Sequence, residues 1–131
     1  MGQASIFLVE DEVLIQMMLI EMVEGLGHRV TAVAGSVDVA RSLAEIEDYD
    51  LAIVDINLQG LSVRPVAQAV TQRGLPLFFL SGYGMAGVPD GFKDKSLLRK
   101  PCTQRALKRT IDLALSSRTD VQEGRRPDSP L

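Results

Sequence analysis

Cysteine and long apolar runs are scarce in this chain, and their scarcity narrows its possible roles. A single cysteine, Cys102, cannot form an internal disulfide, so we expect a reducing compartment. No apolar run approaches the roughly 18 residues of a membrane span. The N-terminus also lacks the basic segment and apolar stretch of a signal peptide. Lysine and arginine (14) do not outnumber aspartate and glutamate (17), which argues against a basic nucleic-acid-binding stripe. We therefore expect a cytoplasmic protein with neither a nucleic-acid nor a membrane partner.

The apolar residues that are present form alternating strand-like and helix-like patterns. Hydrophobic residues make up 46% of 131 residues, enough for the core of one domain. Short apolar runs predict strands at residues 5–9, 29–34, 51–54, 76–80 and 97–99. Amphipathic patterns predict helices at residues 13–26, from 36 or 38 to 46, from 65 up to 74, and at 103–115. This alternation is typical of an α/β fold, and we expect a flavodoxin-like (βα)5 domain with a parallel five-stranded sheet in the order 2-1-3-4-5.

Two segments depart from the alternation. Residues 82–91 contain four glycines and Pro89, so the fourth helix should be short or mobile. The segment from Ser116 onward is polar, has two prolines and shows no periodicity. We therefore expect a domain at residues 1–117 and a disordered C-terminal tail at 118–131.

Charged residues follow three of the expected strands directly. Asp55 follows the third strand, Glu10 and Asp11 follow the first, and Lys100 follows the fifth. Because open α/β sheets bind ligands at the carboxyl ends of their strands, these side chains should converge. Asp55 is then a candidate nucleophile toward phosphorus, with the carboxylates holding Mg²⁺ (or Mn²⁺) and Lys100 supplying a fixed positive charge. Alternatively, Glu10, Asp11 and Glu12 only cap the helix that follows them, because acidic residues stabilise the N-terminus of a helix.

Ser81 and Tyr83 follow the fourth strand and should lie at the same edge. The Ser81 hydroxyl can donate a hydrogen bond to a phosphoryl oxygen on Asp55, or it can be an ordinary turn serine. Tyr83 lies among glycines and can either move with its loop or pack over the fourth strand.

Together these residues resemble the receiver domain of two-component response regulators over about residues 4–117. The resemblance implies that Asp55 is the phosphoacceptor and that Asp11 is a magnesium ligand assisted by Glu10. It further implies that the backbone carbonyl of Asn57 binds the metal.

The resemblance also assigns roles to the ends of the last two strands. Ser81 matches the hydroxyl that switches toward the phosphoryl group, and Lys100 matches the phosphate-binding lysine. The bond between Lys100 and Pro101 is expected to be cis, as is common in the family.

Residues 75–84, Leu-Pro-Leu-Phe-Phe-Leu-Ser-Gly-Tyr-Gly, resemble a narrower group, the FATGUY single-domain receivers. Most receivers carry an aromatic residue three positions before the lysine, whereas this chain has Leu97. The usual aromatic switch is therefore absent, and Tyr83 is the candidate to replace it.

Three functions compete for this sequence. The first is a single-domain response regulator that accepts a phosphoryl group from a histidine kinase or histidine phosphotransfer protein. It would signal through protein contacts or act as a phosphoryl sink, with only slow intrinsic phosphotransfer and autodephosphorylation and no true enzyme activity. The second is a pseudo-receiver that binds partners without phosphate, which the presence of Asp11, Asp55 and Lys100 together disfavours. The third is an aspartyl-phosphate phosphohydrolase. Enzymes of this kind resemble one another in a second aspartate, two residues after the nucleophile, that acts as acid and base. This chain has Asn57 at that position, and asparagine cannot transfer protons.

Overall fold

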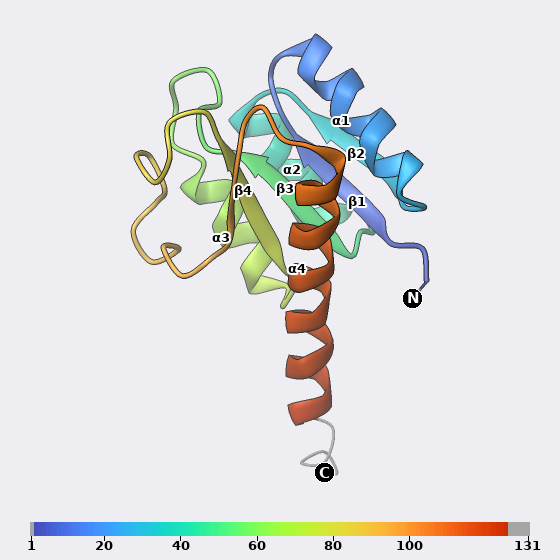
Figure 1. Cartoon of the computed structure of the whole chain (residues 1–131). Helices are drawn as coiled ribbons and strands as arrows, with labels where there is room; N and C mark the ends of the chain where they lie inside the picture. The colour runs from blue at the N-terminus through green and yellow to red at the C-terminus, as the bar shows by residue number, and fades with distance from the viewer. Residues whose placement is uncertain (1, 126–131) are drawn as a thin grey trace.

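The computed structural model describes residues 2–125 and contains one parallel sheet flanked by helices (Figure 1). The five strands are β1 (Ser5–Val9), β2 (Arg29–Ala34), β3 (Leu51–Asp55), β4 (Leu77–Ser81) and β5 (Leu97–Arg99). They lie in the order β2-β1-β3-β4-β5, and all neighbours are parallel. The predicted flavodoxin-like sheet is therefore confirmed.

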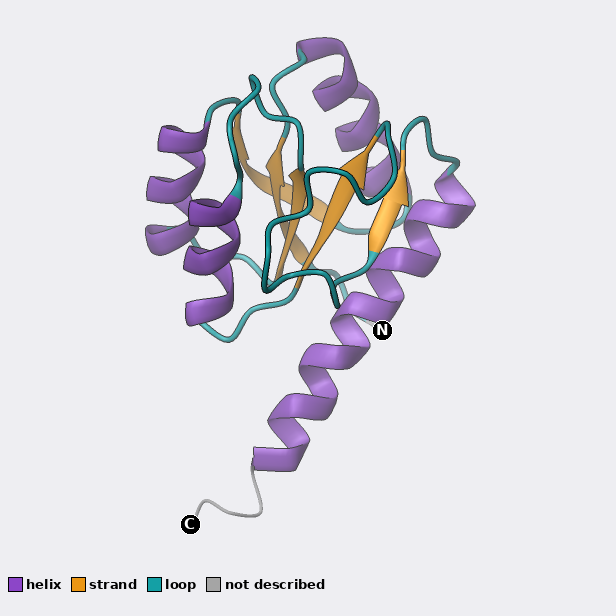
Figure 2. Ribbon diagram, turned by 90° about the vertical axis from the view of Figure 1, so that its left-hand side faces the viewer, coloured by secondary structure: helices purple, strands orange, loops and turns teal. Residues whose placement is uncertain are grey.

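Within residues 2–125, four helices cover the two faces of the sheet. They are α1 (Val13–Gly25), α2 (Val37–Ile46), α3 (Arg64–Gln72) and α4 (Gln104–Arg125). α1 and α4 pack on one face, and α2 and α3 pack on the other (Figure 2). The first residue of α4 also contacts the end of α1, because the Gln104 amide donates a hydrogen bond to the carbonyl of Met22 at 3.2 Å.

The inner strands are buried on both faces, which explains their uninterrupted apolar runs. On β3, Ala52 and Val54 belong to the core beneath α2 and α3, whereas Leu51 and Ile53 belong to the core beneath α1 and α4. This alternation is the normal period of two along a strand. None of the helices in the described part of the chain is long and apolar enough to cross a bilayer.

The connection between β4 and β5 contains no helix. Residues 82–96, all of which are described, form turns and bends, so the helix that was expected to be short or mobile is absent. Val88 and Phe92 from this connection are buried in the core beneath α2 and α3, and they cover the sheet where a helix was expected. Glycine-rich chain can turn often enough to insert single side chains in this way.

α4 is longer than the sequence pattern predicts. The apolar pattern ends at Leu115, but the helix continues to Arg125 and projects beyond the sheet (Figure 1). No glycine or proline interrupts the sequence between Thr103 and Gly124, so nothing in the backbone ends the helix earlier. Residues 118–125 of the predicted tail thus lie in the helix, and residues 126–131 lie outside the described residues.

Candidate functional site

The register of the sheet brings the charged residues together at one edge. Val9 pairs with Val54, so that Glu10 and Asp55, the next residue of each strand, become neighbours. Ser81 pairs with Arg99, which places Lys100 beside the end of β4. The predicted convergence is therefore present, because parallel strands in register end at the same level.

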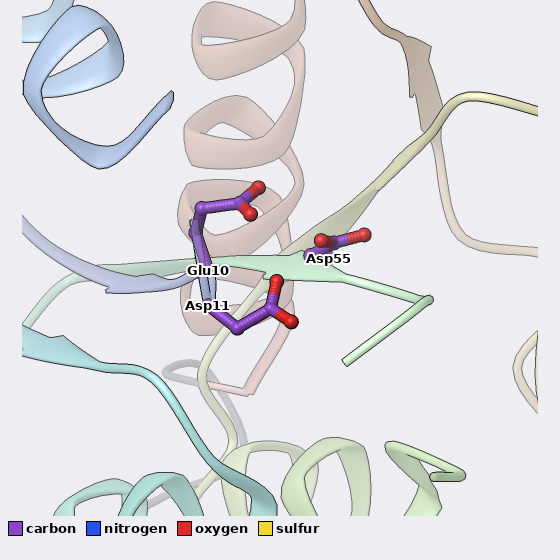
Figure 3. A group of neighbouring side chains, drawn as sticks. All are labelled: Glu10, Asp11 and Asp55. Carbon is purple, nitrogen blue, oxygen red and sulfur yellow. The ribbon is translucent and has the colours of Figure 1, made fainter. Parts of the chain in front are cut away.

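Three carboxylates form a compact group at this edge (Figure 3). One oxygen each from Glu10, Asp11 and Asp55 lies within 4.8 Å of the other two. Glu10 and Asp55 are buried and Asp11 is partly exposed, so the group opens to solvent on the side of Asp11. Hard carboxylate oxygens at this spacing suit Mg²⁺, which these three residues could hold.

Backbone groups hold each carboxylate in place. The amide of Glu12 donates to Glu10 Oε2 at 3.0 Å, and the amide of Asn57 donates to Asp55 Oδ1 at 3.0 Å. The amide of Gln59 donates to Asp11 Oδ2 at 3.3 Å. Asn57 is exposed beside Asp55, and the role of its carbonyl as a metal ligand stays a prediction.

Lys100 joins the two buried carboxylates. Its Nζ lies 3.2 Å from Glu10 Oε1 and 3.2 Å from Asp55 Oδ2, and its side chain is only 20% exposed. Burial lowers the pKa of Lys100, but the charges of Asp55 and Glu10 more than compensate and hold this pKa above its ordinary value. Lys100 is therefore a fixed positive charge next to Asp55. The Lys100–Pro101 bond is cis, as the resemblance implies.

Glu10 is the group whose ionisation is most perturbed. Burial, together with the nearby charge of Asp55, raises the pKa of Glu10 to about 7, against the opposing effects of the Glu12 amide and Lys100. At neutral pH without metal, Glu10 is therefore only partly ionised, and a cation that binds the group must displace its proton.

Ser81 lies at the site, but its hydroxyl is engaged in a local turn. Ser81 Oγ donates to the carbonyl of Gly84 at 2.7 Å and accepts a hydrogen bond from the amide of Tyr83 at 3.0 Å. The side chain of Ser81 is buried and lines the same hollow as Asp55. The hydroxyl is thus within the site but is turned toward the loop that follows β4.

A hollow of about 640 Å³ opens above Asp55 and is lined by Asp55, Asn57, Ser81, Lys100 and Tyr83, among others. Tyr83 is 82% exposed, so it does not pack over β4, the alternative that the sequence left open. Leu97 is partly buried against the core beneath α2 and α3. The side chain of Tyr83 is thus exposed beside the hollow, whereas Leu97 is part of the packing, and the role of Tyr83 as a switch stays a prediction.

The far half of the β4–β5 connection is anchored. Val88 and Phe92 are buried. The Arg64 guanidinium donates to the carbonyl of Asp90 and lies 5.9 Å from the centre of the Phe92 ring. The near half, residues 82–87, carries the exposed side chains of Tyr83 and Met85. Fewer buried side chains therefore hold residues 82–87 than hold the far half of the connection.

Sequence reasoning missed how several residues shape the site, and it considered Glu12 only as an acid at the start of a helix. Glu12 lines the hollow, and the side-chain amide of Gln16 donates a hydrogen bond to the carbonyl of Glu10. Gln59 has a left-handed backbone (φ 55°) and holds Asp11 through its amide. Neither the polar side chains nor the backbone angle has a distinctive sequence signal. Only the Gln59-Gly60 pair indicates a tight turn.

Comparisons with known proteins identify the family. No family model matches the chain. SdrG from Sphingomonas melonis Fr1 is 33% identical, with 86% of this chain and 97% of SdrG covered and a TM-score of 0.76. The PhyR response regulator REC domain of Erythrobacter litoralis is 28% identical, with 87% of this chain and 91% of that domain covered and a TM-score of 0.73. The chain belongs to the receiver domains of response regulators. The receiver is also similar to SdrG from Pseudomonas melonis Fr1 in its BeF3-activated conformation, at 34% identity, with 85% of this chain and 95% of that chain covered and a TM-score of 0.73.

A curated relative is longer than this receiver. The transcriptional regulatory protein PdtaR of Mycobacterium tuberculosis is 28% identical over 115 residues, which are 85% of this receiver and 56% of PdtaR. The receiver thus spans little more than half the length of that relative.

Proposed function

We propose that the receiver accepts a phosphoryl group on Asp55 in a reaction that depends on a divalent cation. The observation that carries the proposal is the placement of Asp55, which is buried at a strand end between a group of carboxylates and a fixed lysine ammonium. An aspartate oxygen can attack phosphorus only where the phosphoryl oxygens are neutralised. Mg²⁺ (or Mn²⁺), held by Asp55, Glu10 and Asp11, would supply that neutralisation on one side.

The side chains of the receiver have distinct tasks in this transfer. A carboxylate oxygen of Asp55 forms the new bond to phosphorus, while the donor's bond to phosphorus breaks and its electron pair leaves with the donor. Lys100, released from part of its contact with Asp55, pairs with a phosphoryl oxygen. Asn57 keeps the other oxygen of Asp55 in place through its backbone amide, which already donates to Oδ1.

Phosphorylation then acts on the loop through Ser81. A phosphoryl group on Asp55 offers the Ser81 hydroxyl a charged acceptor in place of the carbonyl of Gly84, and hydrogen bonds to charged acceptors are the stronger ones. Loss of the Ser81–Gly84 bond frees residues 82–87, and Tyr83 moves with them while the segment held by Arg64 stays in place. The similar SdrG has a BeF3-activated conformation, which supports the existence of an activated state in receivers of this kind.

We further propose that the phosphoryl donor is a histidine kinase or a histidine phosphotransfer protein, and that the output is a protein contact or removal of phosphoryl groups from a pathway. With such donors, we propose that the receiver acts in the cytoplasm of a bacterium. Membership of the FATGUY group stays a prediction from residues 75–84. A phosphohydrolase is the weaker candidate, because Asn57 occupies the position where an acid would be needed and receivers are signalling proteins.

The test is phosphorylation of the receiver by acetyl phosphate with Mg²⁺, followed by intact mass. We expect a gain of one phosphoryl group, which EDTA abolishes. Asp55→Asn should gain none, whereas Asp48→Asn, the same change at an exposed position outside the site, should behave as the wild type. Equal labelling of Asp55→Asn and wild type, or no labelling of the wild type, would refute the proposal.

A further inference from the structure

Glu12 is an exposed acidic residue that lines the hollow above Asp55. Among the described residues that line this hollow, three are aspartate, glutamate or lysine: Asp55, Lys100 and Glu12. Asp55 and Lys100 pair with each other at 3.2 Å. Glu12 is exposed and does not belong to the group of carboxylates that could hold a cation. Its charge therefore faces whatever enters the hollow.

The fold does not depend on the carboxylate of Glu12. The residue is the N-cap of α1, but its side chain makes no capping hydrogen bond. The backbone makes the structural contacts, since its amide donates to Glu10 Oε2 at 3.0 Å and its carbonyl accepts from the amide of Gln16 at 2.9 Å. Another residue type can provide the same backbone contacts, so the side chain is available for a role toward the ligand.

We propose that Glu12 selects the phosphoryl donor by its charge and disfavours dianionic acyl phosphates relative to N-phosphoryl donors. The inference rests on the proposed phosphorylation of Asp55. An acyl phosphate brings two negative charges to the hollow, whereas a phosphoramidate has a protonated nitrogen that cancels one of them. A charge that lines a cleft repels like-charged ligands more strongly than the same charge on an open surface. The penalty from Glu12 is therefore larger for the acyl phosphate.

Both transfers balance with Asp55 as the acceptor. From acetyl phosphate, the bond between phosphorus and the bridging oxygen breaks and acetate leaves with the electron pair. From phosphoramidate, the phosphorus–nitrogen bond breaks and ammonia leaves, because the nitrogen is already protonated. Glu12 forms no bond in either reaction, so it is a specificity-determining residue and not a catalytic one.

The experiment compares labelling rates with acetyl phosphate and with phosphoramidate at saturating Mg²⁺. Removing one charge in Glu12→Gln should raise the ratio of the acetyl phosphate rate to the phosphoramidate rate by roughly two- to fivefold at low salt. The change should shrink at about 1 M salt, where charges are screened over roughly 3 Å. Glu12→Asp keeps the charge and should restore the wild-type ratio. Glu21→Gln, an equal change of charge at an exposed position near the other end of α1, should leave the ratio unchanged.

The outcomes separate this inference from the proposal on which it rests. If Glu12→Gln alters both rates equally or neither, or if Glu21→Gln shifts the ratio as much, Glu12 does not select the donor. If no variant is labelled by either donor, the proposed phosphorylation of Asp55 fails instead. A general loss of structure in Glu12→Gln would lower both rates together and so would not reproduce the expected change of the ratio.

Discussion

Replacing Asp55 by asparagine in the metal-free receiver should change stability in opposite directions on the two sides of neutral pH. The substitution keeps the shape of the side chain and its ability to accept a hydrogen bond from the amide of Asn57, but it removes one charge. That charge attracts Lys100 and repels Glu10 and Asp11. Because Glu10 has a pKa of about 7, its share of the repulsion depends on pH.

The distances in the structure set the size of each effect. At an effective dielectric constant of about 20, the pair between Lys100 and Asp55 at 3.2 Å is worth about 5 kcal/mol. The oxygens of the three acids lie within 4.8 Å of one another, so the repulsion is at least about 3.5 kcal/mol for each of the two acids, or about 7 kcal/mol when both are ionised. At pH 8 the relieved repulsion exceeds the lost attraction by about 2 kcal/mol. At pH 6 Glu10 is mostly protonated, and the balance reverses to a loss of about 1 kcal/mol.

The assay is thermal or urea unfolding in EDTA at pH 6 and pH 8. Asp55→Asn should melt about 6 °C above the wild type at pH 8 and slightly below it at pH 6. Asp48→Asn, an exposed change of equal charge, should show no such reversal. Destabilisation by Asp55→Asn of equal size at both values of pH would show that the three carboxylates do not repel one another as the geometry requires.

Three further outcomes follow from the site and its loop. The free energy of unfolding of the metal-free wild type should fall as pH rises from about 5 to about 7, because the folded state binds the Glu10 proton more tightly than the unfolded state, in which the pKa of Glu10 is near 4.5. In urea unfolding across this range, the stability of Glu10→Gln should depend less on pH. Mg²⁺ should raise the melting temperature of the wild type in proportion to the logarithm of the Mg²⁺ concentration, and it should raise that of Asp11→Asn much less. Thermal melts over a Mg²⁺ titration measure both effects. Hydrogen exchange should be faster at residues 82–87 than at 88–93, and Arg64→Met should accelerate only the second segment; equal protection of both segments in the wild type would contradict the division of the loop.

Sequence patterns predict most of the fold and the centre of the site, for identifiable physical reasons. The apolar run before Asp55 is continuous because β3 is buried on both faces, and such runs end where a charge can reach solvent or a partner. The same reasoning places Glu10 and Lys100 at strand ends. Once the strand order is known, the convergence of these three residues requires no further information.

Other features depend on tertiary contacts that leave little trace in the sequence. Glycines between β4 and β5 indicate a poor helix, but they do not reveal that Val88 and Phe92 are buried in place of one. The end of α4 is misplaced because the apolar pattern stops at Leu115, where packing against the sheet ends and not where the helix ends. The Ser81 hydroxyl can donate either to a phosphoryl group on Asp55 or to the carbonyl of Gly84, and the sequence does not indicate the second acceptor, which the structure has.

The contact between Gln104 and the carbonyl of Met22 has a consequence for how the molecule transmits force. Gln104 lies four residues after Lys100, so the segment that carries the site lysine also holds the last turn of α1. The first turn of α1 is held from the other side, where the Gln16 amide meets the carbonyl of Glu10. α1 is therefore a helix of about 20 Å whose first and last turns are each hydrogen-bonded to a segment that carries a charged residue of the site. If both hydrogen bonds persist, a shift of Lys100 relative to Glu10 would tilt α1, and the exposed apolar side chains of Val13, Leu14 and Met17 would move with it as one surface.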